Sequence, residues 1–347
     1  MSEKKATLND VAKRAGVSAG TVSKYINSSS SVKEVNRKKI EEAIKELKFT
    51  PNVYAQKLAK GKSNTILLCI VSEKNISPST WLYQLPIIQA MNDSLVNNGY
   101  SLQIRIIAVE ETYQLKKCIL GCMDGKEADG IALLSVWNIP MDLIKEMKKR
   151  NFPYVLIEGV GSSRGNGVGI DNKKMVKDLV HILAELGHSK IGFINIRSKQ
   201  EDMKQRAIGY MEGLKEEGLK MNESYMLYGD FSIESGYNCV REYIVNGGEC
   251  TAFIGGNDNM AVGAIKAIQS LNMSVPEDIS VIGIDDSIAA TACTPKLQTV
   301  HFELGLMGRQ ATTQLLEQIR ENANIEIQTI IPYRIVPGES VAKVKQF

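Results

Sequence analysis

Seven apolar runs, separated by stretches long enough for a helix, constrain the fold of this chain more than any other feature. Each run contains few polar residues, as strands that are buried on both faces do. Such runs alternating with helical segments are typical of βαβ units, which build parallel, doubly wound sheets. We therefore predict an α/β core across residues 63–347. In chain order the runs are TILLCIVS, SLQIRIIAV, GIALLSV, YVLIEG, KIGFINI, TAFIGG and ISVIGID.

The length of this core predicts two lobes with a cleft. Roughly 285 residues are more than one compact lobe usually holds. Two later strand-like segments, LQTVHF and TIIPYRIV, would let the chain cross between the lobes more than once. Ligands of parallel sheets bind at the carboxyl ends of the strands. We therefore expect a ligand site where those ends meet.

The first residues follow a different pattern, which predicts a helix-turn-helix. Apolar residues recur at helical spacing on both sides of Gly16, where a helix ends with positive φ, and Ser18 is a suitable N-cap for the second helix. A face of small residues and one lysine is narrow enough to enter a major groove, although an ordinary helical hairpin is the alternative. Leu8, Val11, Ala12, Val22 and Ile26 are expected to be buried, and Ala19, Gly20, Ser23 and Lys24 to point outward.

The distribution of charge favours the DNA-binding interpretation. Residues 1–62 contain 14 Lys and Arg against 6 Asp and Glu, a net charge of +8, and the remaining 28 against 33 give −5. A surface that binds DNA must neutralise phosphates, and the positive charge is concentrated in the segment that carries the motif.

A third helix and a short linker are expected after the motif. A capping box of Ser31 and Glu34 would open that helix, and Ile40, Ala43, Ile44 and Leu47 mark its buried face. Pro51 then interrupts the helical pattern, and residues 53–60 have helical propensity but are too short to stay helical alone. Gly61-Lys62-Ser63 is a flexible joint, which places a domain boundary near residue 62.

Enzyme motifs are weak in this sequence. The chain has three histidines, and neither GxxxxGK[ST] nor HExxH occurs. One GxSxG is present at 161–165, but the glycine-rich NGVGI after it is strand-like, whereas a nucleophile elbow needs a helix there. We therefore expect no catalytic residues and no cofactor.

The positions of the cysteines and the hydropathy of the chain indicate which classes of protein do not match it. The cysteines occur without CxxC pairs and are expected to be buried thiols; Cys118 and Cys122 are one helical turn apart but lack a third ligand, so no metal is expected. No run reaches the roughly 18 apolar residues of a membrane span, and the N-terminus lacks an apolar signal region. The expected location is the cytoplasm. The cysteines are 69, 118, 122, 239, 250 and 293.

Nine stretches of this chain, among them ATLNDVAKRAGVSAGTVSKYIN and GGNDNMAVGAIKAI, follow one another in an order and at a spacing that resemble the lactose-repressor/galactose-repressor family of bacterial transcription regulators over nearly the whole length. The resemblance implies an N-terminal all-α helix-turn-helix DNA-binding domain with a hinge helix, followed by a two-lobed α/β core like that of periplasmic binding proteins. The stretches that carry it are ATLNDVAKRAGVSAGTVSKYIN, EEAIKELKFTPNVYAQKLAKG, GIDNKKMV, ELGHSKIGFI, RAIGYMEGL, YGDFSIESGY, GGNDNMAVGAIKAI, VPEDISVIGIDDS and TPKLQTV.

The resemblance divides the chain into a headpiece of residues 1–50, a hinge helix and linker of residues 51–62, and a core of residues 63–347. Within the core, residues 63–167 with 298–327 are expected to form one lobe, and residues 168–297 with 328–340 the other.

The resemblance implies a homodimer on a double-stranded, pseudo-palindromic operator. The base-reading positions are Ala19, Gly20 and Lys24, of which Lys24 alone has a long side chain that donates to a guanine edge. Leu58 corresponds to a leucine that wedges into the central base step and bends the duplex. The residues better assigned to backbone phosphates are Thr21, Ser23 and Asn27.

The resemblance also implies a small-molecule effector in the cleft. Arg206, Asn257 and Asp285 suit hydrogen bonding to a polyol, and Phe231 matches an aromatic residue that stacks on a ligand ring. Asn257 and Asp285 as helix caps, and Phe231 as a core residue, are the structural alternatives; Asp171 is expected to cap a helix.

The first lobe departs from the family pattern, and its weaker effector candidates are Trp81, Tyr83 and Glu158. A sugar or sugar phosphate is the default effector, and a purine or nucleoside the second choice. The alternative function is a two-lobed solute-binding protein without a regulatory role, which the basic first 62 residues disfavour.

Overall fold

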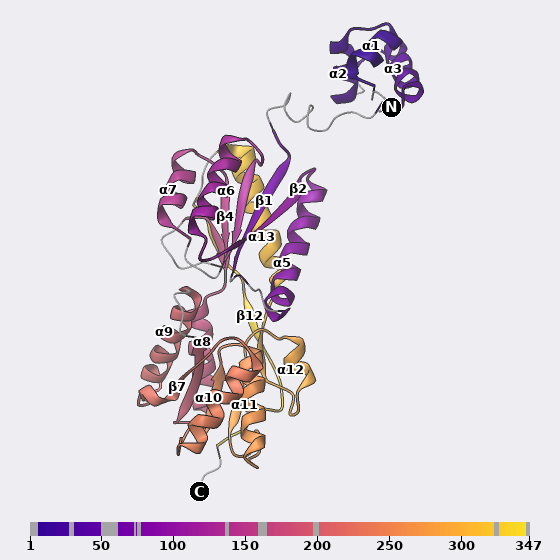
Figure 1. Ribbon diagram of the computed structural model, residues 1–347. Coiled ribbons are helices and arrows are strands. Elements are labelled where there is room, and N and C mark those ends of the chain that lie inside the picture. The colour runs from indigo at the N-terminus through magenta and orange to yellow at the C-terminus, as the bar shows by residue number, and fades with distance from the viewer. Residues whose placement is uncertain are drawn as a thin grey trace. The chain divides into compact units, whose positions relative to one another are not determined.

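The computed structural model describes residues 6–27, 31–49, 62–72, 74, 78–135, 139–158, 165–196, 201–322 and 326–344. The chain divides into two compact units, Met1–Asn64 and Thr65–Phe347 (Figure 1). Each unit has its own hydrophobic core.

The N-terminal unit contains a helix-turn-helix followed by a third helix, as predicted. Val11, Val22 and Ile40 have no exposed surface and come from three different helices, so each helix contributes to one small core. Ile26, expected to be buried, is only half-buried at the margin of that core. The helices are α1 (Leu8–Ala15), α2 (Ala19–Asn27) and α3 (Glu34–Glu46).

The ends of α1 are fixed by local hydrogen bonds. Thr7 and Asp10 form a reciprocal capping box: Oγ1 of Thr7 accepts from the Asp10 amide and Oδ2 of Asp10 accepts from the Thr7 amide. At the other end Gly16 adopts φ 64°, as predicted, and its amide donates to the Ala12 carbonyl. The helix therefore starts and stops at set residues.

The capping box predicted for α3 is wrong. The N-cap is Lys33, which makes no side-chain capping bond, so Glu34 is the first helical residue instead of the third. Its carboxylate accepts a hydrogen bond from Arg37 at 2.8 Å. The acidic residue therefore supports α3 through an i,i+3 pair.

The first lobe of the core is built on a six-stranded parallel sheet in the order β11-β5-β4-β3-β1-β2. Helices α5 and α13 pack on one face, and α6 and α7 on the other. The strands are β1 (Thr65–Ser72), β2 (Ser101–Ala108), β3 (Gly130–Leu134), β4 (Tyr154–Ile157), β5 (Gly167–Gly169) and β11 (Gln328–Ile330); the helices are α5 (Pro78–Asn97), α6 (Thr112–Asp124), α7 (Met141–Lys149) and α13 (Leu304–Glu321).

The second lobe is built on a four-stranded parallel sheet in the order β7-β6-β8-β9. Helices α8 and α9 pack together and cover one face, and α10 and α11 the other. The elements are β6 (Ile191–Ile196), β7 (Met226–Gly229), β8 (Ala252–Gly255), β9 (Ser280–Ile282), α8 (Asn172–Glu185), α9 (Glu201–Glu216), α10 (Ile233–Val245), α11 (Asp258–Ser270), α12 (Ile288–Ala292) and the short 3-10 helix η2 (Glu223–Tyr225).

All seven predicted apolar runs contain a strand, but two details differ from expectation. Strand β2 is not buried on both faces, because it lies at the edge of its sheet and only Ile107 is buried. Strand β7 was not predicted; it is an edge strand too, and its partly exposed residues lack an apolar run.

Two late strands connect the lobes. Strands β10 (Thr299–Phe302) and β12 (Tyr333–Val336) pair antiparallel, with Thr299 opposite Val336. The expected lobe limits need a correction here: β11, placed with the second lobe in the prediction, pairs with β5 in the first sheet. The final crossing therefore begins after Ile330, because β11 completes the first sheet before the chain leaves it.

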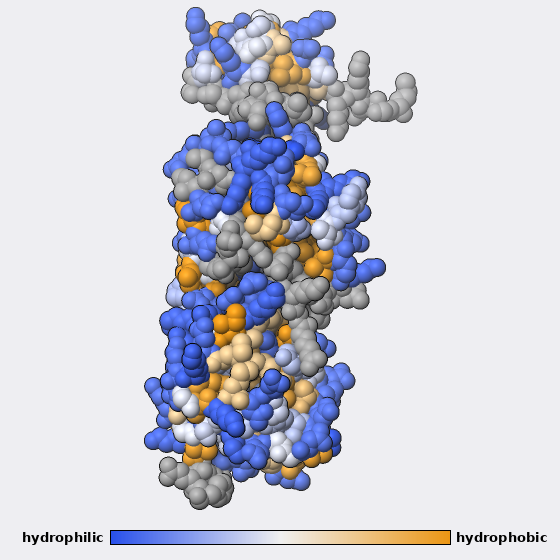
Figure 2. Space-filling view, turned by 90° about the vertical axis from the view of Figure 1, so that its left-hand side faces the viewer, coloured by the Kyte–Doolittle hydropathy of each residue, from blue (hydrophilic) through white to orange (hydrophobic). Residues whose placement is uncertain are grey.

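The surface around α7 and α9 is mainly hydrophilic, with smaller hydrophobic patches (Figure 2). Among the described residues, no helix is both long and apolar enough to span a membrane.

Candidate DNA-binding surface and effector site

Helix α2 presents a small exposed surface around Gly20 and Lys24, as expected for the base-reading residues. Ala19, which was expected to point outward, is half-buried and packs against the three-helix core. The expectation is therefore only partly met for Ala19, because this first residue of α2 is one of those that pack against the core. Ser23 is half-buried as well.

Ser18 caps α2 as predicted. Its Oγ accepts a hydrogen bond from the Thr21 amide at 3.2 Å and lies 2.9 Å from Oγ1 of Thr21. Thr21, predicted to bind a phosphate, therefore has its hydroxyl beside the N-cap. The side chain of Asn27, the wedge residue Leu58 and the rest of the hinge segment 51–61 lie outside the described residues.

Arg206 is the most constrained of the predicted effector residues. It lies on α9, is 7% exposed, and its Nε donates to Oδ1 of Asn172 at 2.7 Å. Its Nη1 donates to the carbonyl oxygen of Gly256, at the end of β8. Among the described residues Nη2 makes no hydrogen bond, so the two N–H groups of Nη2 remain available on a fixed guanidinium.

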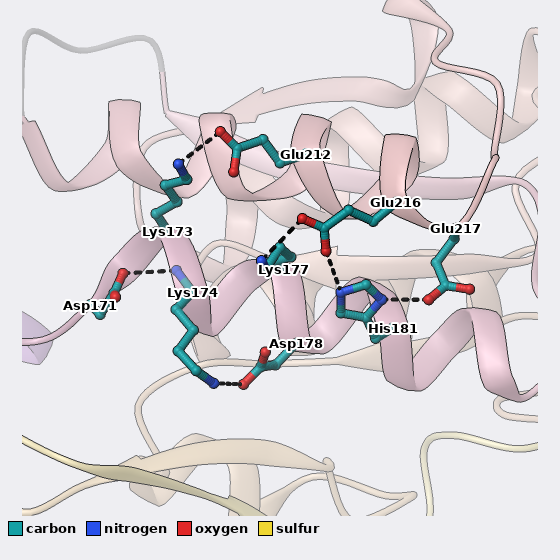
Figure 3. Close-up of polar contacts among 9 residues, drawn as sticks. All are labelled: Asp171, Lys173, Lys174, Lys177, Asp178, His181, Glu212, Glu216 and Glu217. Atoms are coloured by element: carbon teal, nitrogen blue, oxygen red, sulfur yellow. Dashed lines mark hydrogen bonds and ion pairs between the residues drawn. The ribbon is translucent and has the colours of Figure 1, made fainter.

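The close packing of α8 against α9 brings Arg206 to Asn172. A Cβ atom on Gly209 would lie 2.1 Å from the carbonyl oxygen of Lys173, so only glycine lets the helices approach this closely. Farther along, ion pairs join the helices: Lys173 with Glu212 and Lys177 with Glu216 (Figure 3).

His181 extends this row of contacts, because it lies between Glu216 and Glu217 (Figure 3). The side chains of these pairs are partly exposed to solvent, so each pair adds little to stability.

Asn257 serves as the N-cap of α11, one of the two roles considered for it. Its Oδ1 accepts from the Met260 amide at 2.9 Å, and its Nδ2 donates to the carbonyl oxygen of Phe231 at 3.2 Å. Asn259 donates to the same carbonyl at 3.2 Å. Both polar atoms of the Asn257 side chain therefore have hydrogen-bond partners within the protein. The backbone carbonyl of Phe231 accepts hydrogen bonds from two side-chain amides.

Tyr83 and Glu158, the weaker candidates of the first lobe, contact each other. Tyr83 on α5 donates its hydroxyl hydrogen to Oε1 of Glu158, the residue directly after β4. Burial raises the pKa of both groups, and for Glu158 the bond from Tyr83 and the charge of Arg206 oppose that rise. Trp81 is half-buried two residues earlier on α5 and packs against the main core.

Asp285 is the last of the predicted effector residues, and it belongs to the second lobe. Burial raises its pKa well above the usual value, with further upward contributions from Asp258 and Glu158 and a downward one from Arg206. Among the described residues the Asp285 carboxylate accepts no hydrogen bond. Tyr83 and Glu158 of the first lobe therefore lie within electrostatic range of Arg206 and Asp285 of the second.

Three of the predicted effector residues have backbone conformations that are rare for side chains with a Cβ. The angle φ is 60° at Glu158, 70° at Phe231 and 122° at Asp285. Such conformations cost free energy unless the surroundings impose them. All three residues follow strands or begin turns, so the strain is concentrated at the strand ends.

Two residues that sequence reasoning did not assign to the site are Asn172 and Asp258. Asn172 orients Arg206, and its only signal was its position directly after Asp171, which caps α8 as expected. Asp258 is 1% exposed and accepts from the Ser287 amide at 2.7 Å and from the Thr299 hydroxyl. Burial raises the pKa of Asp258 to about 6. Among the described residues, no group of three or more potential metal ligands is present.

Comparisons with known proteins agree with this arrangement. The model for bacterial regulatory proteins of the lacI family matches residues 7–52, and that for a periplasmic binding protein-like domain matches residues 180–341. The HTH-type transcriptional repressor PurR of Erwinia tasmaniensis is 34% identical over 342 residues, covering 97% of each chain. The chain belongs to the lacI family of bacterial regulatory proteins. It is thus a DNA-binding transcriptional regulator.

Other family members are similar over the same length. Catabolite control protein A of Priestia megaterium is 29% identical, over 95% of this chain and 97% of its own. The lac repressor dimer bound to operator and the anti-inducer ONPF superposes with a TM-score of 0.85 at 25% identity, over 98% of this chain and 100% of the other. The complex of transcriptional regulator CelR with cellobiose superposes with a TM-score of 0.70 at 28% identity, over 96% of this chain and 99% of the other. These relatives are named as regulators, not as enzymes.

Proposed function

We propose that this lacI-family regulator is a homodimeric repressor whose affinity for a pseudo-palindromic operator is controlled by a small polyhydroxyl effector, a sugar or a sugar derivative. The effector would bind to side chains of both lobes of the core. We place the protein in the cytoplasm, where operator DNA is found, and assign it no catalytic activity.

One observation carries the effector part of this proposal. Arg206 is fixed by two hydrogen bonds and keeps the N–H donors of Nη2, while the nearby Asp285 carboxylate makes no hydrogen bond within the described residues. A planar donor next to a carboxylate is the combination that binds vicinal hydroxyl groups. Tyr83 and Glu158 add a donor and acceptors from the first lobe.

The strained backbone supports the same assignment. Glu158, Phe231 and Asp285 all have positive φ, a conformation that costs free energy at a residue with a Cβ and that is frequent at ligand-binding sites. Asn257 contributes indirectly, because its Nδ2 holds the backbone of Phe231. The names of relatives fit as well, since one solved structure is of CelR with cellobiose.

The DNA part of the proposal relies on α2 and on charge. Gly20 and Lys24 are exposed on the second helix of a helix-turn-helix, within a segment of net charge +8. We propose that Lys24 reads a base edge, with Ala19 and Gly20 beside it, and that Thr21, Ser23 and Asn27 contact phosphates. The wedge role of Leu58 remains part of the proposal.

An apolar surface at one edge of the first lobe supports the homodimer. Ile104 and Ile106 lie on the edge strand β2 on the side that α5 covers, yet are 43% and 51% exposed. Leu82 and Leu85 on α5 are more than half exposed. An exposed apolar surface next to an unpaired strand edge favours contact with a second copy.

Thermal stability and operator binding of the full chain test the proposal. A sugar that raises the melting temperature, in a screen that also contains sugar phosphates and nucleobases, should change the affinity for a palindromic promoter fragment. Arg206→Ala should abolish both effects while leaving operator affinity without the ligand unchanged. Ligand binding without any change in operator affinity would instead support the solute-binding alternative.

A further inference from the structure

Three of the six cysteines gather on one side of the first sheet, away from the effector candidates. Cys69 is in the middle of β1, and Cys118 and Cys122 are one turn apart on α6. Cys69 and Cys122 are buried, whereas Cys118 is only partly so. Neither the proposed effector site nor the DNA-binding surface uses any of them.

Two of these thiols are in contact with each other. The Sγ atoms of Cys69 and Cys118 are 3.9 Å apart, so each sulfur lies against the other across the β1–α6 packing. A disulfide needs about 2.05 Å between the sulfurs, so its formation requires the two atoms to approach each other by about 2 Å. Within the described part of the chain, no such contact joins Cys122 to Cys118, although both are on α6.

A fixed cation points at the more accessible sulfur. Arg105 lies on β2 in register with Cys69 on β1, and its Nη1 donates to Sγ of Cys118 at 3.4 Å. Its Nη2 donates to Oε2 of Glu127 at 2.6 Å, so the guanidinium is held from the opposite side. Arginine stays charged at all relevant pH values and therefore favours the thiolate form of Cys118.

The pKa values of the six cysteines differ, because their thiols differ in hydrogen bonding and in burial. A hydrogen bond from the Cys69 thiol, aided by Arg105, lowers the pKa of Cys118 to about 6. Burial raises the pKa of Cys122 and of Cys239 to about 11 and that of Cys250 to about 12. The pKa of Cys69 and of Cys293 is raised too. Cys118 is therefore the most acidic of the six thiols, and it lies beside a less acidic one.

We propose that Cys118 is a hydroperoxide-reactive modification site, with Cys69 as its resolving thiol and Arg105 as the residue that activates it. Nothing in this assignment depends on the effector or the operator. A small oxidant, such as hydrogen peroxide, can then modify the first lobe covalently at Cys118.

The chemistry has two balanced steps. The Cys118 thiolate attacks one oxygen of the peroxide, the O–O bond breaks, and Cys118 becomes a sulfenic acid while hydroxide leaves and takes up a proton as water. The Cys69 sulfur then attacks the sulfenic sulfur, a disulfide forms, and a second water leaves with the Cys69 proton. The peroxide accepts both electrons, and two thiols are oxidised to one disulfide.

Alkylation of the unmodified full chain tests the first half of the proposal without any variant. Reduced protein is treated briefly with iodoacetamide at pH values from 5 to 9, and each cysteine is quantified by peptide mass. Cys118 should react at least tenfold faster than Cys239 and Cys293 at pH 7, with a midpoint near pH 6. Equal rates for these three partly buried cysteines at pH 7 would overturn the proposal.

Peroxide treatment tests the second half. The wild-type chain should lose two thiols and yield one cross-linked peptide pair containing Cys69 and Cys118, reversible by dithiothreitol. Cys69→Ser should stop at a Cys118 sulfenic acid that dimedone traps, and Cys122→Ser, the matched control, should behave as wild type. A Cys118–Cys122 cross-link, or a dimedone adduct on another cysteine, contradicts the assignment.

Arg105 is tested as a positioning residue by the pH profile. Arg105→Gln should shift the alkylation midpoint of Cys118 upward by at least one pH unit, and Arg105→Lys should restore part of the shift. Glu127→Gln removes the other partner of the guanidinium and should leave the midpoint unchanged or lower it. An unaltered midpoint in Arg105→Gln, with the protein still folded, excludes this role.

Discussion

Nε of Arg206 donates a hydrogen bond to Oδ1 of Asn172 at 2.7 Å, so a residue at the start of α8 sets the orientation of a guanidinium on α9. Because Nη1 is bonded to the Gly256 carbonyl, the guanidinium plane is defined by two elements at once. Preorganisation of this kind reduces the entropy that a ligand must overcome when it binds.

Asn172→Ala should weaken effector binding although Asn172 is not itself assigned to the ligand. Loss of the acceptor frees the guanidinium to rotate, and we expect about a tenfold rise in effector Kd, equivalent to about 1.4 kcal/mol. Titration of the full chain with the sugar found by thermal screening measures the change. The matched control is Asp171→Ala, which removes the cap of α8 and should lower stability by about 1 kcal/mol without a change in Kd. The same rise in Kd in both variants would indicate a general disturbance of α8.

Gly209→Ala should destabilise the second lobe. The new methyl group would overlap the Lys173 carbonyl, at 2.1 Å, and α8 and α9 must separate to accept it. Overpacking against backbone costs about 1–3 kcal/mol, which urea denaturation detects. Gly121→Ala is the control, because this glycine is also helical and a Cβ there meets nothing within 4 Å. It should be neutral or stabilise the protein by up to about 1 kcal/mol. Equal stability of the two variants would mean that α8 and α9 are not closely packed at Gly209.

Asp258 should give the protein a distinctive pH dependence. Its pKa is about 6 in the folded chain, against 3.8 as the ordinary value, so the folded state binds the extra proton between about pH 4 and 6. The contribution of Asp258 to the free energy of unfolding is therefore full below pH 4 and falls as the pH rises to 6, by at most ~3 kcal/mol. Urea denaturation across this range should show a shallower decline in Asp258→Asn. Parallel curves for wild type and Asp258→Asn would contradict the prediction.

Thr7→Ala should loosen the N-terminal unit alone. It removes the acceptor of the Asp10 amide and leaves only the bond from the Thr7 backbone amide to Asp10, for a loss of about 1 kcal/mol in helix stability. Hydrogen exchange of the α1 amides should accelerate about fivefold, and operator affinity should fall, while exchange in the core stays constant. Thr7→Ser keeps the hydroxyl and should leave α1 exchange as in the wild type. Faster exchange throughout the core would show that the effect is not local.

Much of the fold follows from the sequence because its elements are defined locally. The apolar run at 65–72 became a strand with every residue buried, and Gly16 took the positive φ that ends α1. The strands at sheet edges were predicted less well. The burial of β2 was predicted wrongly, because its apolar residues are mostly exposed, and the sequence of β7 has no pattern that indicates a strand. Edge position depends on strand order, which a single segment does not encode.

The site was harder to predict than the fold. Arg206 and Asp285 were identified by resemblance, but the residue that orients Arg206 was not, because an asparagine at a helix start usually serves as a cap or faces solvent. The contact of Tyr83 with Glu158 joins residues 75 positions apart in a region that departs from the family pattern. Asn257 shows the opposite case, where the structural alternative, a helix cap, describes one of its two side-chain hydrogen bonds.

The pairing of β10 with β12 limits how the two lobes of the core can move. Their register runs from Thr299 with Val336 to Phe302 with Tyr333, so two of the connecting segments form one ladder and bend as a single unit. Tyr333 also donates its hydroxyl hydrogen to Asp178 on α8, which ties that ladder to the second lobe. Rotation of one lobe against the other therefore requires both strands to bend together, or their ladder to break.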